Sequence, residues 1–143
     1  MSTLNNAINA GFKTGTFTPT ITGSSANPTS ITYSTQVGEY VQLGNIIFYQ
    51  ARVVVSALTI GAASGNLQIT GLPVASHDNG AGYPGSAWIQ STAFSGGLAS
   101  NIGTNTTVVN IIEYASSSLI TILPITALTS SSDFSVSGFY FTS

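Results

Sequence analysis

The chain has 143 residues, of which 43% are hydrophobic and 10% aromatic, but only 4% are charged. Soluble domains usually carry about 25% charged residues. Here there are two Lys or Arg residues, four Asp or Glu residues and one His. So few cations exclude the basic surfaces that bind nucleic acids or anionic membranes. The absence of Cys excludes disulfides and thiolate metal sites.

This composition predicts one folded domain that hides much of its surface against other proteins. Its hydrophobicity separates it from disordered chains, and a chain of this length buries roughly 70% of its unfolded surface. A net charge of −2 gives little repulsion between copies. No apolar run approaches the roughly 20 residues that span a bilayer. The N-terminus lacks the basic and apolar regions of a signal peptide, so we expect no secretory export.

Residues 1–14 are predicted to form a short N-terminal arm. Leu4 and Ile8 would lie on one face of a short helix that ends at Gly11. One or two helical turns are marginal in water. We therefore expect either a frayed terminus or an arm that docks on adjacent subunits through Leu4, Ile8 and Phe12.

Residues 15–143 are predicted to form an all-β domain, because short runs with a period of two alternate with turn residues. Pro19 confines the first run to a sheet edge or a strand start, and Gly44 with Asn45 predicts a two-residue hairpin. No convincing helix follows residue 12, which indicates an antiparallel sandwich or barrel. The predicted strands are 16–22, 30–36, 39–43, 46–58, 67–70, 87–93, 106–114, 119–123 and 133–142.

Several predicted strands are apolar on both faces. An antiparallel sheet with one solvated face should alternate cleanly between apolar and polar residues. The two-sided pattern therefore predicts that a second subunit covers the outer face. The residues expected at this interface are Phe48, Arg52, Val54, Phe139 and Phe141.

Arg52 lies among apolar neighbours in the middle of a predicted strand. A buried arginine without a partner is costly. We therefore expect an ion pair, with Glu39 or Glu113 as its partner. Direct contact with a ligand is the alternative interpretation.

The glycine-rich loop 77–85 is the best candidate for a ligand-binding surface. Its aromatic and neutral polar groups suit sugars or proteins. The alternative is that the loop is merely exposed and that Trp88 packs in the core. The residues concerned are His77, Asp78, Asn79, Tyr83 and Trp88.

The same loop gives little support for catalysis or metal binding. A catalytic triad needs a His between a carboxylate and a hydroxyl, whereas the adjacent side chains of His77 and Asp78 point apart. Asp78, Asn79 and Gly80 form a common turn sequence, without the further acidic ligands of a calcium loop. We therefore expect no enzyme activity, no metal ion and no cofactor.

Four stretches together resemble a β-sandwich domain that recurs in virion proteins of tailed bacteriophages, often at the C-terminal end of tail fibres and tailspikes. They are GTFTPTITG at 15–23, YSTQVGEYVQLGN at 33–45, LQITGLP at 67–73 and SGFYFT at 137–142. The resemblance spans most of residues 15–142. It implies an antiparallel β-sandwich of jelly-roll type that assembles as a homotrimer in a virus particle.

In fibres such a domain follows a long shaft, whereas here only a short segment lies between Met1 and the first predicted strand. We therefore expect a capsid decoration (cement) protein that binds across subunits of the major capsid protein and stabilises the shell. The alternative is a receptor-binding domain of a tail fibre or tailspike, which would attach to host surface glycans. Either reading places the protein in the virion, on the capsid surface or on the tail.

Overall fold

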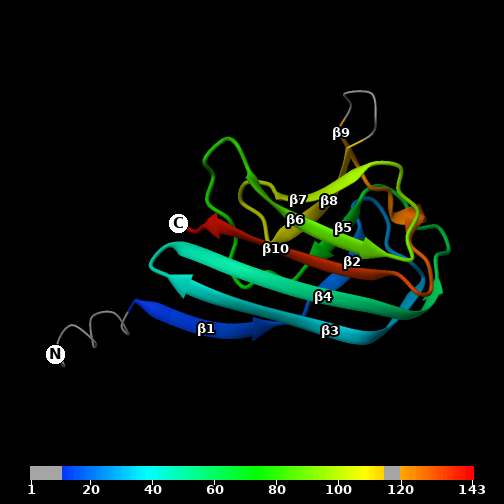
Figure 1. Ribbon diagram of the computed structural model, residues 1–143, viewed down its shortest axis with the longest axis horizontal. Helices are drawn as coiled ribbons and strands as arrows, with labels where there is room; N and C mark the ends of the chain where they lie inside the picture. The colour runs from blue at the N-terminus through cyan, green and yellow to red at the C-terminus, as the bar shows by residue number, and fades with distance from the viewer. Residues whose placement is uncertain (1–10, 115–119) are drawn as a thin grey trace.

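The computed structural model describes residues 11–114 and 120–143, and these form an all-β protein (Figure 1). Ten strands and one short 3₁₀ turn are present in these ranges. In chain order they are β1 (Phe12–Phe17), β2 (Thr20–Gly23), β3 (Ser30–Leu43), β4 (Ile46–Thr59), β5 (Leu67–Thr70), β6 (Tyr83–Gln90), β7 (Gly97–Ile102), β8 (Val108–Tyr114), β9 (Ile120–Ile122), η1 (Ile125–Ala127) and β10 (Asp133–Phe141).

All ten strands belong to one curled antiparallel sheet. Its order is β1-β3-β4-β10-β6-β7-β8-β5-β2, and β9 pairs with β8. In Figure 1 one half of the sheet, with β3, β4 and β10, faces the half that contains β7, β8 and β5. The expected all-β antiparallel class is confirmed. The jelly-roll sandwich is not, because the strands form one continuous half-barrel sheet instead of two separate layers.

The sheet curls because its two edge strands are consecutive in the sequence. Only residues 18–19 separate β1 from β2, so the opposite ends of the sheet must come close together. Side chains of β3 bridge the remaining gap: the Ile21 N–H donates to the Tyr33 hydroxyl at 2.9 Å, and the Gln36 amide donates to the Pro19 carbonyl at 2.9 Å. The run 16–22 is not one strand as predicted: it is divided at Pro19, which has no N–H group and lies between the two edge strands β1 and β2.

Two other strand boundaries differ from the sequence-based expectation. The segments 30–36 and 39–43 form one strand, β3, because Val37 and Gly38 between them pair with β4 without a break; the register shift in β3 lies earlier, near Tyr33. Such irregularities increase bend and twist in a continuous strand. Strand β6 begins at Tyr83, earlier than predicted, and β7 was not predicted. The hairpin at Gly44 and Asn45 is confirmed, and Gly44 has the positive φ of 60° that a primed turn requires.

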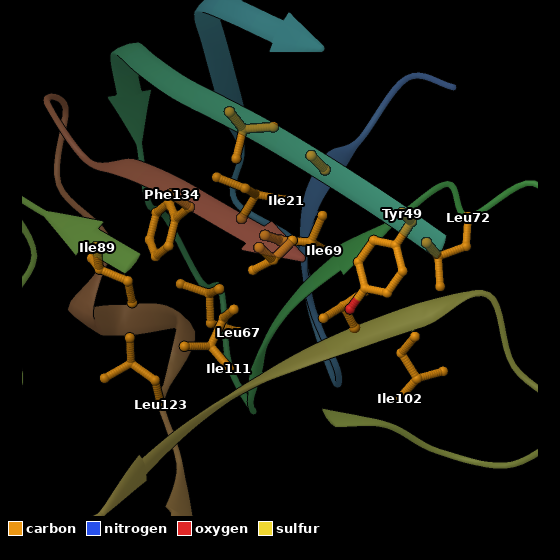
Figure 2. Close-up of a cluster of buried hydrophobic side chains, with 14 of the residues drawn as sticks. Ile21, Tyr49, Leu67, Ile69, Leu72, Ile89, Ile102, Ile111, Leu123 and Phe134 are labelled. Atoms are coloured by element: carbon orange, nitrogen blue, oxygen red, sulfur yellow. The ribbon is translucent and has the colours of Figure 1, made fainter. Parts of the chain in front are cut away.

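The core lies inside the curl (Figure 2). Ile47, Val53, Ile111 and Phe134 come from three different strands, and each is 0% exposed. Alternate residues of β4 point inward, as the period of two in its sequence predicts. Burial of these apolar side chains is the main source of stability.

Three glycines in the strands lie opposite aromatic residues. Gly15 pairs with Tyr40, and Gly38 pairs with Phe17. A Cβ atom on either glycine would lie within 2.7 Å of the partner's ring, so the ring occupies the space that a side chain would take. Gly138 pairs with Tyr49, and a Cβ atom there would lie 3.3 Å from the Tyr49 ring. These pairs explain glycines that would otherwise weaken a strand.

Candidate interface on the outer sheet face

Two neighbouring rows of apolar side chains cross the outer face of the sheet where β10 ends. In the first row Val41, Phe48 and Phe139 lie opposite one another across β3, β4 and β10. The Phe48 and Phe139 ring centroids are 6.0 Å apart. In the next row Phe12, Leu43, Ile46 and Phe141 lie opposite one another. We call these seven residues the apolar band.

The apolar band is exposed to a degree unusual for such side chains. Phe12, Leu43, Phe48 and Phe139 are between 48% and 50% exposed, and Phe141 is 37% exposed. Scattered exposed apolar residues are normal, whereas a contiguous patch marks an interaction surface. In Figure 1 the band lies at the end of the sheet where β1 begins, the β3–β4 hairpin turns and β10 ends. This is the candidate functional site.

A polar row lies beside the apolar band on the same face. Thr16, Glu39, Gln50, Ser137 and Ser86 are aligned across β1, β3, β4, β10 and β6. A hollow of about 530 Å³ extends from this row onto the apolar band. Thr14, Thr16, Glu39, Phe48 and Gln50 are among its lining residues. It therefore combines an aromatic ring with hydroxyl, amide and carboxylate groups.

An ion pair occupies the next part of the outer face. The Arg52 guanidinium donates two hydrogen bonds to the Asp133 carboxylate, Nε to Oδ1 at 3.1 Å and Nη2 to Oδ2 at 2.7 Å. These bonds and the charge of Asp133 raise the pKa of Arg52 above its ordinary value. The prediction of an ion pair is confirmed, but its expected partner, Glu39 or Glu113, is wrong.

The reason for that error is register, which sequence alone does not give. Asp133 on β10 lies diagonally across from Arg52 on β4. Glu113 instead accepts hydrogen bonds from the Ser95 hydroxyl, at 2.7 Å, and from the Ser95 N–H. These bonds lower the pKa of Glu113.

The five residues predicted at a subunit interface all lie on the outer face. Phe48, Phe139 and Phe141 belong to the apolar band, Arg52 forms the ion pair, and Val54 is half-buried between β3 and β10. Sequence reasoning missed Val41, Leu43 and Ile46 as members of the same patch. The alternation of strand 46–58 contained the signal for Ile46, but cross-strand register was needed to connect it with β3.

The predicted ligand loop is divided by the structure. His77, Asp78 and Asn79 are exposed, whereas Tyr83 is only 5% exposed and belongs to the core. Its assignment to an exposed loop is wrong, because its hydroxyl donates to the His77 carbonyl at 2.9 Å and its ring packs among other aromatic rings.

Trp88 is 51% exposed on the outer face of β6, in the row of Ser135 and Arg52. The alternative that it packs in the core is therefore wrong. It lies toward the end of β6 that is farther from the loop, so the five predicted residues do not form one site.

The predicted N-terminal arm lies mostly outside the described residues, including Leu4 and Ile8. Phe12 is the first residue of β1 and pairs with Leu43. The sheet therefore begins within the segment 1–14 that was expected to be an arm.

Polar groups suited to chemistry are scattered in the described part of the chain. His77 Nδ1 lies 3.3 Å from the Ser143 hydroxyl, and Asp78 accepts a hydrogen bond from the Asn105 side chain at 3.2 Å. No group of three His, Cys, Asp or Glu residues suited to a metal ion was found in residues 11–114 and 120–143. Over the same ranges, no helix is long and apolar enough to cross a membrane.

The fold and the site define a class of protein, a curled antiparallel β-domain with an exposed apolar sheet face. No protein-family model matches the chain, and no curated protein matches it. Among solved structures it is similar to part of the Dettilon tailspike protein (gp208), with a TM-score of 0.64 and 22% sequence identity. The match covers 91% of this chain but 24% of the tailspike chain. At this identity the likeness establishes a shared fold.

Proposed function

We propose that this protein is a structural component of a tailed-bacteriophage particle and that it works by binding other protein surfaces, not by catalysis. The observation that supports this most strongly is the apolar band, a contiguous apolar surface on a chain with almost no charge. The fold shared with part of a phage tailspike supports the assignment to a virus particle.

The energetics favour burial of the band as a unit. Complete burial of a large apolar side chain is worth about 1.5–3 kcal/mol, so covering the exposed half of one residue contributes about 1 kcal/mol. Association costs an estimated 4–15 kcal/mol in lost freedom of motion and in ordering. One or two contacts cannot offset that cost, whereas the five band residues that are 37–50% exposed together contribute about 5 kcal/mol on each copy, which reaches that range.

The partner that covers the band is a second copy of the chain, in a homotrimer. A neutral, apolar surface present on every copy can be buried in a closed symmetric assembly. The band forms the centre of this interface. Arg52 and Val54 lie on the same face beyond the polar row, so they form its rim. The Arg52–Asp133 pair places no unpaired charge there.

Two positions in the particle follow from different observations. The predicted arm favours a capsid decoration protein that binds across subunits of the major capsid protein. The fold shared with a tailspike favours a place on the tail. Trp88 adds to the second reading, because its ring is 51% exposed on the outer face of β6 and an aromatic ring suits a host surface glycan.

Localisation of the protein in intact particles tests the proposal. Antibody labelling viewed by electron microscopy should place it over the shell if it is a decoration protein and on the tail if it attaches to the host. A protein absent from purified particles would overturn the structural role.

The glycan reading has a separate test. The purified protein should bind host cells, and Trp88→Ala should weaken that binding. Gln90→Ala, at the next outward-facing position of β6, is the matched control. Equal binding by the wild type and both variants would remove this reading and leave the structural role untouched.

A further inference from the structure

We propose that Asn79 is a site of spontaneous, self-assisted deamidation, with Asp78 as the group that promotes it. Asn79 precedes Gly80, and the sequence contains no other Asn-Gly pair. Glycine leaves the backbone nitrogen after Asn79 unhindered, because it has no side chain. Both residues lie in the exposed part of the loop between Leu72 and β6.

In deamidation the Gly80 backbone nitrogen is the nucleophile that attacks the Asn79 side chain. The loop places the Asp78 carboxylate, a base, against the N–H group of this nitrogen. The Gly80 N–H donates to Asp78 Oδ1 at 3.1 Å. The other carboxylate oxygen, Oδ2, accepts a hydrogen bond from the Asn105 side chain at 3.2 Å, which orients the carboxylate. A positioned carboxylate that accepts the proton of an attacking group acts as a general base.

The same loop polarises the side-chain carbonyl of Asn79, whose Cγ atom is the electrophile. Asn79 Oδ1 accepts hydrogen bonds from the Ala81 N–H at 3.0 Å and the Gly82 N–H at 3.2 Å. Two backbone donors on a carbonyl oxygen stabilise the negative charge that develops there when a nucleophile adds. Base, nucleophile, electrophile and oxyanion donors thus lie within residues 78–82.

The reaction balances with water as the co-reactant. The Gly80 nitrogen attacks Asn79 Cγ and loses its proton to Asp78, so a new N–Cγ bond forms. The bond from Cγ to Nδ2 then breaks, and ammonia leaves with the transferred proton. Water opens the resulting cyclic imide at either of its carbonyls, giving aspartate or isoaspartate at this position.

The product has a local consequence. Conversion to aspartate adds one negative charge to a chain whose net charge is −2, and isoaspartate also lengthens the backbone. The loop is anchored beside the apolar band, since the His77 N–H donates to the carbonyl of Phe141 at 2.6 Å. Ageing of the protein would therefore alter the loop next to the candidate interface.

Peptide mapping of the full chain, incubated at neutral pH, tests the proposal. The folded wild type should lose the Asn79 amide at least as fast as the same chain unfolded in urea. Asp78→Asn should slow the loss by roughly an order of magnitude, less than the usual contribution of an enzyme's general base. Asn105→Gly, which removes the orienting contact and suits the positive φ of 53° at this position, should slow it less. Asn27 is an internal control, because Pro28 has no N–H to attack with.

Two results would overturn the proposal. One is a folded wild type that keeps its Asn79 amide while the unfolded chain loses it. The other is a folded Asp78→Asn variant that deamidates as fast as the wild type. Thermal unfolding checks the fold of each variant. If Asp78→Asn fails to fold, the comparison of folded and unfolded wild type still decides.

Discussion

The inner and outer faces of β4 and β10 contain the same kinds of residue in different surroundings. On the inner face Val53 and Phe134 are 0% exposed, whereas on the outer face Phe48 and Phe139 are each 48% exposed. The inner residues are covered by the far half of the curled sheet. Among the described residues nothing covers the outer ones to that extent. A strand with two apolar faces thus serves two interfaces, one within the chain and one that we propose between chains.

The largest predicted effect separates the two faces. Phe134→Ala should destabilise the protein by about 3–5 kcal/mol, because it leaves a cavity in the core. Phe48→Ala should change the stability of an isolated protomer by about 0.5 kcal/mol or less, as is usual for surface positions. Urea unfolding at low protein concentration measures both. Similar losses in the two variants would show that the outer face is part of the folded core.

Crowding inside the sheet gives the next largest effect. Gly38→Ala places a Cβ atom 2.7 Å from the Phe17 ring. Forcing extra atoms into a packed site costs about 1–3 kcal/mol, which should appear as a lower urea midpoint. Gly11→Ala is the matched control, since a Cβ atom there meets nothing within 4 Å. If both variants unfold at the wild-type midpoint, the Phe17 ring does not need the space that a glycine leaves at position 38.

A smaller loss is expected from a single buried hydroxyl. Tyr140 is 0% exposed and donates to the Val74 carbonyl at 2.9 Å. Tyr140→Phe should cost about 1 kcal/mol, and up to about 3 if the carbonyl stays unsatisfied. A variant as stable as the wild type would mean that this hydrogen bond contributes nothing net.

The raised pKa of Tyr140 predicts that the protein loses stability at alkaline pH. Burial raises the pKa of Tyr140 from 10.0 to about 12. Between these values the unfolded chain loses the proton and the folded chain keeps it, so stability falls as the pH rises from 10.0 to about 12. Tyr140→Phe should show a shallower decline in melting temperature over this interval. Parallel pH profiles would contradict the assignment.

The smallest effect concerns Glu113, whose hydrogen bonds from Ser95 lower its pKa from the ordinary value of 4.5. The stability that it contributes is present above that value and is lost as the pH falls through the lower, folded-state pKa. Glu113→Gln should therefore flatten the acid side of the melting profile slightly. Glu39→Gln, which alters a carboxylate on the outer face, is the control. A profile unchanged by Glu113→Gln would contradict this reading.

Much of the fold was predictable from the sequence because strands have a simple period. The long strand 46–58, the Gly44–Asn45 hairpin and the strand 67–70 agree with β4, the β3–β4 turn and β5. Strand order was not predictable, because it depends on contacts between residues far apart in the chain. For that reason Asp133 was missed as the partner of Arg52, and one curled sheet was taken for two layers.

The candidate site was predictable in part, for a related reason. Phe48, Phe139 and Phe141 stood out because their strands are apolar on both faces. That these residues form one patch with Leu43 and Phe12 depends on the register of four strands, which the sequence alone does not give. Tyr83 was wrongly assigned to the loop, because it begins strand β6 and its ring is buried in the core. Only its hydroxyl contacts the loop, at the His77 carbonyl. Turn residues alone do not reveal where the loop ends.

The most direct test of the central claim is the native mass of the protein by sedimentation. We expect the wild type to sediment as a trimer of 14.6 kDa protomers. The double variant Phe48→Ser with Phe139→Ser, in the centre of the apolar band, should be a folded monomer. Phe94→Ser, at a similarly exposed position in the loop between β6 and β7, should remain a trimer. A wild type that stays monomeric, or a double variant that remains a trimer, would contradict the account.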